Sequence, residues 1–312
     1  MSEAAVNLEN LVDEAPVDIG KKTVLLRLTL GALGVRRSLS KSLVEIDADK
    51  TMIHLGKDIL DSPVLKKIRA HDGATRAYLD SKAFPSQFKK GVYVVATAMV
   101  NDIDPVLQKR KAERAGLVDE FLAGYPSECE ESLRRLRAAG QRADYPPVEV
   151  VRSLFTFTYS YFLFDVPDAL KNISAEIFQR EAENAKEWKS EVEKEVRSAL
   201  VLTMKGVTDH LLDRLSKTSE EGRVKGLRES AVAGLTDFLN DFAKQDVANF
   251  TELQALVGRA RGLMDGVDVD TLRNNLGIRD VVEKGLVDIK EQLDKLVVEK
   301  PDRRIVFDDD DV

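Results

Sequence analysis

The stretch that decides the fold is Asp168–Lys217, DALKNISAEIFQREAENAKEWKSEVEKEVRSALVLTMKGVTDHLLDRLSK. Side chains that can be buried recur there at steps of three or four almost everywhere, the spacing of one face of an α-helix. They are Leu170, Ile173, Ile177, Trp188, Val192, Val196, Ala199, Thr203, Val207, Leu211 and Leu215. No proline interrupts the stretch, and Gly206 is its only glycine. The pattern predicts one helix of about 75 Å, which must pair with another helix or project from the body.

Three further helices are expected after the long one, joined to it by a turn at Thr218–Gly222. The ranges are 223–244, 249–265 and 270–298, the last interrupted at Gly277. These helices would cover the long one as an antiparallel hairpin, coiled coil or bundle. Gly258, Gly262 and Gly266 follow one another at helical spacing, which suggests that the third helix approaches a neighbour closely.

The first half of the chain mixes strand and helix patterns. Strands are expected where β-branched, aromatic or alternating residues are bounded by Gly or Pro. They lie at 21–30, 91–97 and 154–164, and the last of these is also compatible with a helix. Helices are expected from Ser62-Pro63, from Asp104-Pro105 to a stop at Gly124-Tyr125-Pro126, and over 128–139.

Together these patterns predict a mainly α protein with a small β component. The expected parts are a flexible N-terminal arm (residues 1–20), an α+β head (21–165), a long-helix stalk or bundle (166–299) and an acidic tail (300–312).

Composition favours a cytoplasmic protein. Cys129 is the single cysteine, which excludes an internal disulfide and fits a reducing compartment. We find neither a signal-peptide pattern at the N-terminus nor an apolar run long enough to span a membrane. Residues 1–150 carry 23 Lys and Arg against 22 Asp and Glu, whereas residues 151–312 carry 24 against 32. The acidic second half argues against broad phosphate-backbone binding there.

Motifs that carry catalysis are absent from the sequence. There is no GxxxxGK[ST] or GxGxxG loop, and Gly31-Ala-Leu-Gly34 is better explained as a turn. His54, His71 and His210 have no His or Cys neighbour at metal-ligand spacing. Carboxylates surround Cys129 and should raise the pKa of its thiol, which makes a poor nucleophile. We therefore assign no catalytic, cofactor-binding or metal-ligating residue and expect no cofactor.

Charged clusters are the remaining candidates for binding. The acidic pairs Asp47/Asp49 and Asp102/Asp104 could hold a cation, although Asp104 before Pro105 is more simply a helix cap. The Asp308–Asp311 run is a solvated end or a segment that docks on a basic patch. Basic clusters lie at 66–69, 89–90, 109–114 and 134–142, and they are either solvated helix faces or nucleic-acid contacts.

Several segments together resemble one family. They are the strand Val24–Leu30, FPSQFKKGVYVV at 84–95, VDEFLAGYP at 118–126, the aromatic stretch before Pro167 and the long helix with Trp188. This combination over residues 20–215 resembles an uncharacterised bacterial domain of unknown function found in phages and plasmids. Genes of that family tend to lie beside MoxR-type AAA+ ATPases and von Willebrand factor A proteins.

The resemblance implies an accessory or adaptor protein, and it supplies no catalytic residues. The chain has no Walker motif and no Asp-x-Ser-x-Ser metal site, so it would be neither the ATPase nor the von Willebrand factor A protein. We therefore expect a non-enzymatic interaction or adaptor protein without a membrane partner. The alternative is a nucleic-acid-associated protein that uses the basic clusters of the N-terminal half.

Overall fold

The computed structural model describes residues 4–6, 19–44, 48–49, 51–86, 90–163, 165–216 and 227–299. It is mainly α-helical with a small antiparallel β component, so the predicted fold class is confirmed. The chain divides into two compact units. The sheet unit comprises Leu25–Val95 and Met99–Phe162, and the bundle unit comprises Met1–Val24, Ala96–Ala98 and Leu163–Val312.

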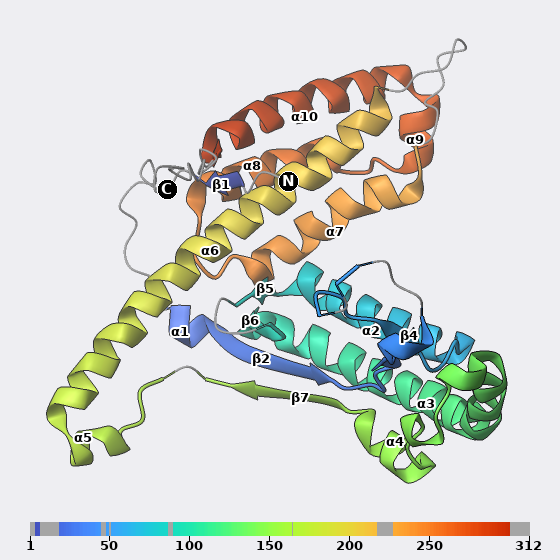
Figure 1. The fold of residues 1–312 in the computed structure, drawn as a ribbon. Helices are drawn as coiled ribbons and strands as arrows, with labels where there is room; N and C mark the ends of the chain where they lie inside the picture. Colours follow the sequence, from blue (N-terminus) through green and yellow to red (C-terminus); the bar gives the residue numbers. More distant parts are fainter. Residues whose placement is uncertain are drawn as a thin grey trace, which may run out of the picture. The chain divides into compact units, whose positions relative to one another are not determined.

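A four-stranded sheet organises the sheet unit, with strand order β5-β6-β2-β7 (Figure 1). Its strands are β2 (Thr23–Leu30), β5 (Phe84–Pro85), β6 (Val92–Ala96) and β7 (Phe157–Phe162). Strands β2 and β7 are antiparallel, with Leu25 opposite Phe162 and Leu30 opposite Phe157. The expected strands at 21–30, 91–97 and 154–164 are thus neighbours in one sheet, each shorter than its pattern.

The aromatic segment confirms the strand interpretation only from Phe157 onward. Leu154 is instead the last residue of the helix α4 (Val148–Leu154), so the helical alternative is correct for Leu154. Along β7 the rings of Phe157, Tyr159 and Tyr161 stack edge to face, with centroids 6.5 and 6.2 Å apart. Only Phe157 of this ladder is buried, whereas Tyr159 and Tyr161 are half-buried and Phe162 is exposed. The core role expected for these aromatics therefore holds for Phe157 alone.

Two long helices, α2 (Pro63–Lys82) and α3 (Val100–Leu136), lie side by side over one face of the sheet (Figure 1). The predicted start of α2 is confirmed, because the Ser62 hydroxyl accepts a hydrogen bond from the Leu65 amide and Pro63 occupies the first turn. Their apolar faces form the core of the unit together with α4 and the loops after β2 and before α2.

The course of α3 differs from the prediction. It begins at Val100, so Asp104 lies inside the helix and is not its cap, and it continues through Gly124, Tyr125 and Pro126. A proline within a helix removes one backbone hydrogen bond. Burial offsets that loss, because the buried face continues unbroken on both sides of the proline. That face comprises Val118, Phe121, Leu122, Tyr125, Cys129 and Ser132.

Smaller elements complete the sheet unit. A ribbon pairs β3 (Arg36–Ser38) with β4 (Gly56–Asp58), and single 3-10 turns lie at Lys41–Leu43, Arg137–Ala139 and Arg142–Asp144. The 3-10 turn at Thr97–Met99 joins β6 to α3.

In the bundle unit the long helix is present but shorter than predicted. The chain bends at Ser174, which separates α5 (Ala169–Ile173) from α6 (Ala175–Leu215). The Ser174 backbone is extended, and the Ser174 hydroxyl accepts a hydrogen bond from the Ile177 amide. Ser174 is therefore the N-cap of α6. A helix of 41 residues spans about 60 Å.

The expected covering helices form a four-helix bundle with α6 (Figure 1). They are α7 (Glu229–Gln245), α8 (Thr251–Met264) and α10 (Leu276–Leu296), with the short α9 (Val269–Asn274) before the last. Helix α6 packs against α7 and α10, and α8 packs against the same two helices on the opposite corner. The break in the last helical segment falls at Asn275, which caps α10, and not at Gly277.

The expected close approach through Gly258, Gly262 and Gly266 is wrong. A Cβ added at any of these glycines would meet no described atom within 4 Å. The close contact is made by Gly285 on α10, where an added Cβ would clash with the Leu263 side chain on α8.

Near the termini, β1 (Ala4–Val6) pairs with β8 (Val297–Glu299) in antiparallel register, and the short helix α1 (Ile19–Lys22) precedes β2. Ala4–Val6 therefore belongs to a strand pair, which differs from the expected free arm. The expected turn at 218–222 and the acidic tail at 300–312 lie outside the described residues, as does the rest of the arm before Ile19.

Candidate functional site

The three histidines occupy separate, unremarkable positions. His54 and His210 are exposed, whereas His71 on α2 lies 3.4 Å from Glu113 on α3. Within the described residues, no group of three or more His, Cys, Asp and Glu side chains could hold a metal ion.

Cys129 is buried in the core of the sheet unit. Burial is the main cause that raises the pKa of its thiol, while the carboxylates of Glu128 and Glu130 add smaller contributions in the same direction. The predicted direction of the shift is therefore confirmed, although the expected neighbours are the lesser cause.

One member of each acidic pair makes local hydrogen bonds. Asp49 accepts hydrogen bonds from the amide and hydroxyl of Thr51, and the amide bond is the main reason that its pKa is lowered. On α3 the Asp104 carboxylate accepts the Gln108 side-chain amide at 2.6 Å. Asp47 lies outside the described residues.

Several cations of the basic clusters face a nearby carboxylate. The ion pairs are Lys66–Asp61, Lys67–Glu120, Lys109–Glu113, Arg134–Glu131, Arg135–Asp61 and Arg142–Glu130. These partners balance part of the positive charge, which lowers the excess charge that the clusters offer to a phosphate backbone. Lys89 of the second cluster lies outside the described residues.

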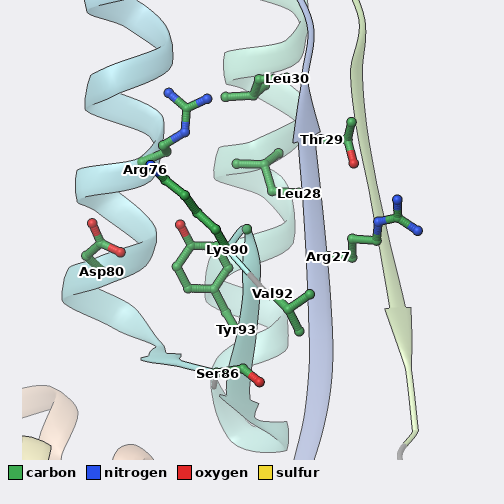
Figure 2. A pocket seen from close by; sticks show the side chains of 11 residues that line it. Arg27, Leu28, Thr29, Leu30, Arg76, Asp80, Ser86, Lys90, Val92 and Tyr93 are labelled. Carbon is green, nitrogen blue, oxygen red and sulfur yellow. The ribbon is translucent and has the colours of Figure 1, made fainter. Parts of the chain in front are cut away.

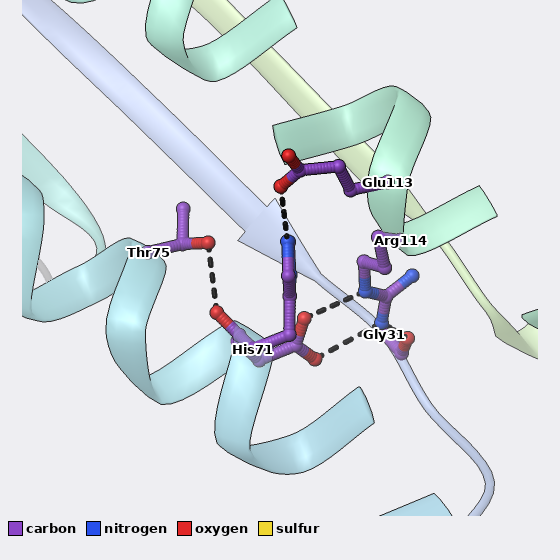
Figure 3. Close-up of polar contacts among 6 residues, drawn as sticks. Gly31, His71, Thr75, Glu113 and Arg114 are labelled. Carbon is purple, nitrogen blue, oxygen red and sulfur yellow. Dashed lines mark hydrogen bonds and ion pairs between the residues drawn. The ribbon is translucent and has the colours of Figure 1, made fainter. Parts of the chain in front are cut away.

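A buried ion pair joins α2, α3 and the end of β2 (Figure 3). Arg114 donates to both carboxylate oxygens of Asp72, at 2.6 and 3.0 Å, and to the Gly31 carbonyl at 2.7 Å. The side chains of Arg114 and Asp72 are only 2% and 8% exposed. An enclosed pair of this kind fixes the packing of three elements.

The N-terminal part of α6 offers a surface on the bundle unit. No residue of α6 before Ala185 is buried, so its first turns extend past the bundle core. Ile173 and Ile177, beside the α5–α6 bend, are 74% and 37% exposed. A 640 Å³ pocket lies along the same segment, with Val166, Phe178 and Ala182 among its lining residues.

Charged groups surround this α6 pocket. Lys171 pairs with Asp168 at 2.7 Å, and its ammonium lies 4.7 Å from the centre of the Phe178 ring. Lys186 and Lys189 line the pocket from α6. An apolar centre with a polar rim is the usual composition of a protein-binding surface.

A second pocket, of 440 Å³, lies in the sheet unit between β2, the start of β6 and α2 (Figure 2). Arg76 and Asp80 reach it from α2, and Lys90 reaches it from the turn before β6. The Tyr93 ring lies on the same side of β2 as Arg76 and Asp80. The pKa of the Tyr93 hydroxyl is raised, mainly by burial and to a smaller extent by the Asp80 carboxylate. This pocket is not predicted from the sequence, because Arg76 and Lys90 belong to segments with different local patterns.

No family model, curated protein or solved structure matches the chain. Among the helices that the structure describes, none is long and apolar enough to cross a membrane.

Proposed function

We propose that this chain is a non-enzymatic interaction or adaptor protein that binds a partner protein through the N-terminal end of α6. The observation that carries the proposal is the run of α6 before Ala185, where no side chain is buried although isoleucine and phenylalanine occur. A helix end that extends past the core of its bundle is only marginally stable in water, because it has no packing partner. A partner protein that covers the apolar side chains would supply this packing.

The partner class follows from the resemblance to the phage and plasmid family. An accessory subunit of a MoxR-type AAA+ ATPase system, located in the cytoplasm, is the most specific form of the proposal. In support, the apolar centre and charged rim of the α6 pocket fit a protein surface better than a nucleic acid.

Affinity capture from the native host tests the proposal. The chain would be tagged at its own locus and isolated in three forms: unaltered, with Ile173→Asp plus Ile177→Asp, and with Val281→Asp. Val281 on α10 is 63% exposed and provides a matched control, since it also places a charge on an exposed apolar position.

We expect a defined ATPase or von Willebrand factor A protein to accompany the unaltered chain and the Val281 variant. The double isoleucine variant should lose it by about tenfold or more, because charged groups would enter a desolvated contact. Equal recovery with all three forms would place the contact elsewhere, and a chain isolated alone would contradict the function itself.

A further inference from the structure

The turn before β6 holds Lys90 at the mouth of the sheet-unit pocket. The Leu28 amide donates a hydrogen bond of 2.8 Å to the Gly91 carbonyl, which binds the turn to β2. Gly91 has a φ of +88°, and an added Cβ would lie 2.8 Å from the Leu28 carbonyl oxygen. Only glycine fits there without strain, so the backbone position of Lys90 is set by this contact.

Arg76 and Asp80 face the pocket from the other side. They are one helical turn apart on α2 and therefore share a face of that helix. The side chains of Arg27 and Thr29 also belong to the lining, but Figure 2 shows them on the opposite side of β2. The chemistry of the pocket therefore rests on Arg76, Asp80, Lys90 and Tyr93.

The two cations differ from the paired basic residues nearby on α2. Neither Arg76 nor Lys90 forms a hydrogen bond or ion pair with another residue in the part of the chain that the structure describes. The Asp80 carboxylate is close enough to the Tyr93 hydroxyl to add to the rise in its pKa. The pocket thus presents two unpaired positive charges and one carboxylate that can accept hydrogen bonds.

We propose that this pocket binds a small phosphate monoester whose carbon skeleton carries hydroxyl groups. The phosphoryl group lies between the Arg76 guanidinium and the Lys90 ammonium, and a ligand hydroxyl donates to the Asp80 carboxylate. A phosphate monoester carries nearly two negative charges at neutral pH, which two cations match. The cavity of 440 Å³ lies in the range of small-molecule sites. This site is separate from the proposed α6 contact and does not depend on it.

Sugar phosphates and nucleoside monophosphates share this chemistry, so the test has an arm for each. Isothermal titration of the full chain at pH 7.5 would use ribose 5-phosphate, adenosine monophosphate, inorganic phosphate and ribose as probes. The variants are Arg76→Gln, Lys90→Gln and Asp80→Asn. Arg69→Gln is the control, because Arg69 is also an exposed arginine of α2 but does not line the pocket.

We expect one or both organic phosphates to bind and ribose not to bind. Arg76→Gln and Lys90→Gln should each weaken binding by about tenfold or more, the effect of losing one charge-assisted hydrogen bond. Asp80→Asn should reduce the preference for the organic phosphate over inorganic phosphate, and Arg69→Gln should change neither property. Circular dichroism melts confirm that each variant is folded.

Two results would overturn the inference. One is no binding of either organic phosphate by the unaltered chain at millimolar concentration. The other is binding that folded Arg76→Gln and Lys90→Gln variants retain in full. Equal affinity for inorganic phosphate and both organic phosphates would remove the assignment of a hydroxyl-bearing skeleton.

Discussion

Asp72 and Arg114 form a more tightly enclosed ion pair than Lys57 and Asp144, the other buried pair described in the sheet unit. Asp72 and Arg114 each sit on a helix rich in other charged residues, and they are 42 positions apart. Nothing in the local pattern of either helix distinguishes them from solvated neighbours. Only the packing of α2 on α3 pairs them, which explains why the sequence did not predict the contact.

Breaking this pair should destabilise the chain strongly. Arg114→Met leaves the Asp72 carboxylate buried without its partner, and we expect a loss of about 3–5 kcal/mol in the free energy of unfolding. The double change Arg114→Met with Asp72→Leu should recover part of that loss, because no charge then remains buried. Urea unfolding followed by circular dichroism measures both.

The exposed Arg69→Met on the same helix α2 serves as control and should shift the free energy of unfolding by less than about 0.5 kcal/mol. A loss below about 1 kcal/mol for Arg114→Met would show that the pair is not enclosed as described.

Cys129 gives a prediction about pH. Burial raises the pKa of its thiol in the folded chain, so at pH 8 a thiol reagent should react more slowly with the folded chain than with the unfolded chain. The stability linked to this thiol is fully present below its unfolded pKa of about 8.5 and is lost as the pH rises through the higher folded value. Ellman's reagent with and without denaturant measures the difference, and equal rates in the two states would contradict the burial.

At the scale of single elements, the periodicity predicted helices well but placed their ends poorly. Glycine and proline at Gly124-Tyr125-Pro126 predict the end of a helix, yet α3 continues because the apolar face on both sides of Pro126 is buried in one core. The opposite error occurred at Ser174, where a serine N-cap divides α5 from α6 without any proline or glycine. The spacing of apolar residues indicates which face of a helix is buried. The end of a helix depends on a single capping side chain, which that spacing does not reveal.

The contact between α8 and α10 yields a paired prediction. Gly285→Ala places a methyl group against the end of the Leu263 side chain on α8, which has to move aside. Gly262→Ala on α8 meets nothing within 4 Å and should stabilise the helix by up to about 1 kcal/mol. We therefore expect Gly285→Ala to stabilise the chain less than Gly262→Ala does. Thermal unfolding of both variants measures the difference, and an equal gain for the two would contradict the close packing.

Across the whole molecule, the mainly α class and the presence of covering helices followed from the sequence alone. The strand order β6-β2-β7 could not be predicted from the sequence, because the pairing of segments far apart in the chain depends on tertiary contacts that periodicity does not record. The same holds for the pocket that brings Arg76 and Lys90 together. The surface on α6 was foreseeable in part, since a long helix has to be covered or project.

The proposed contact between the N-terminal end of α6 and a partner protein can be tested by site-specific photo-crosslinking in the native host. A photoreactive residue would replace Ile177 and, as the matched control, Val281 on α10. We expect an adduct with one defined protein from position 177 and none from position 281. No adduct from position 177, or the same adducts from both positions, would contradict it.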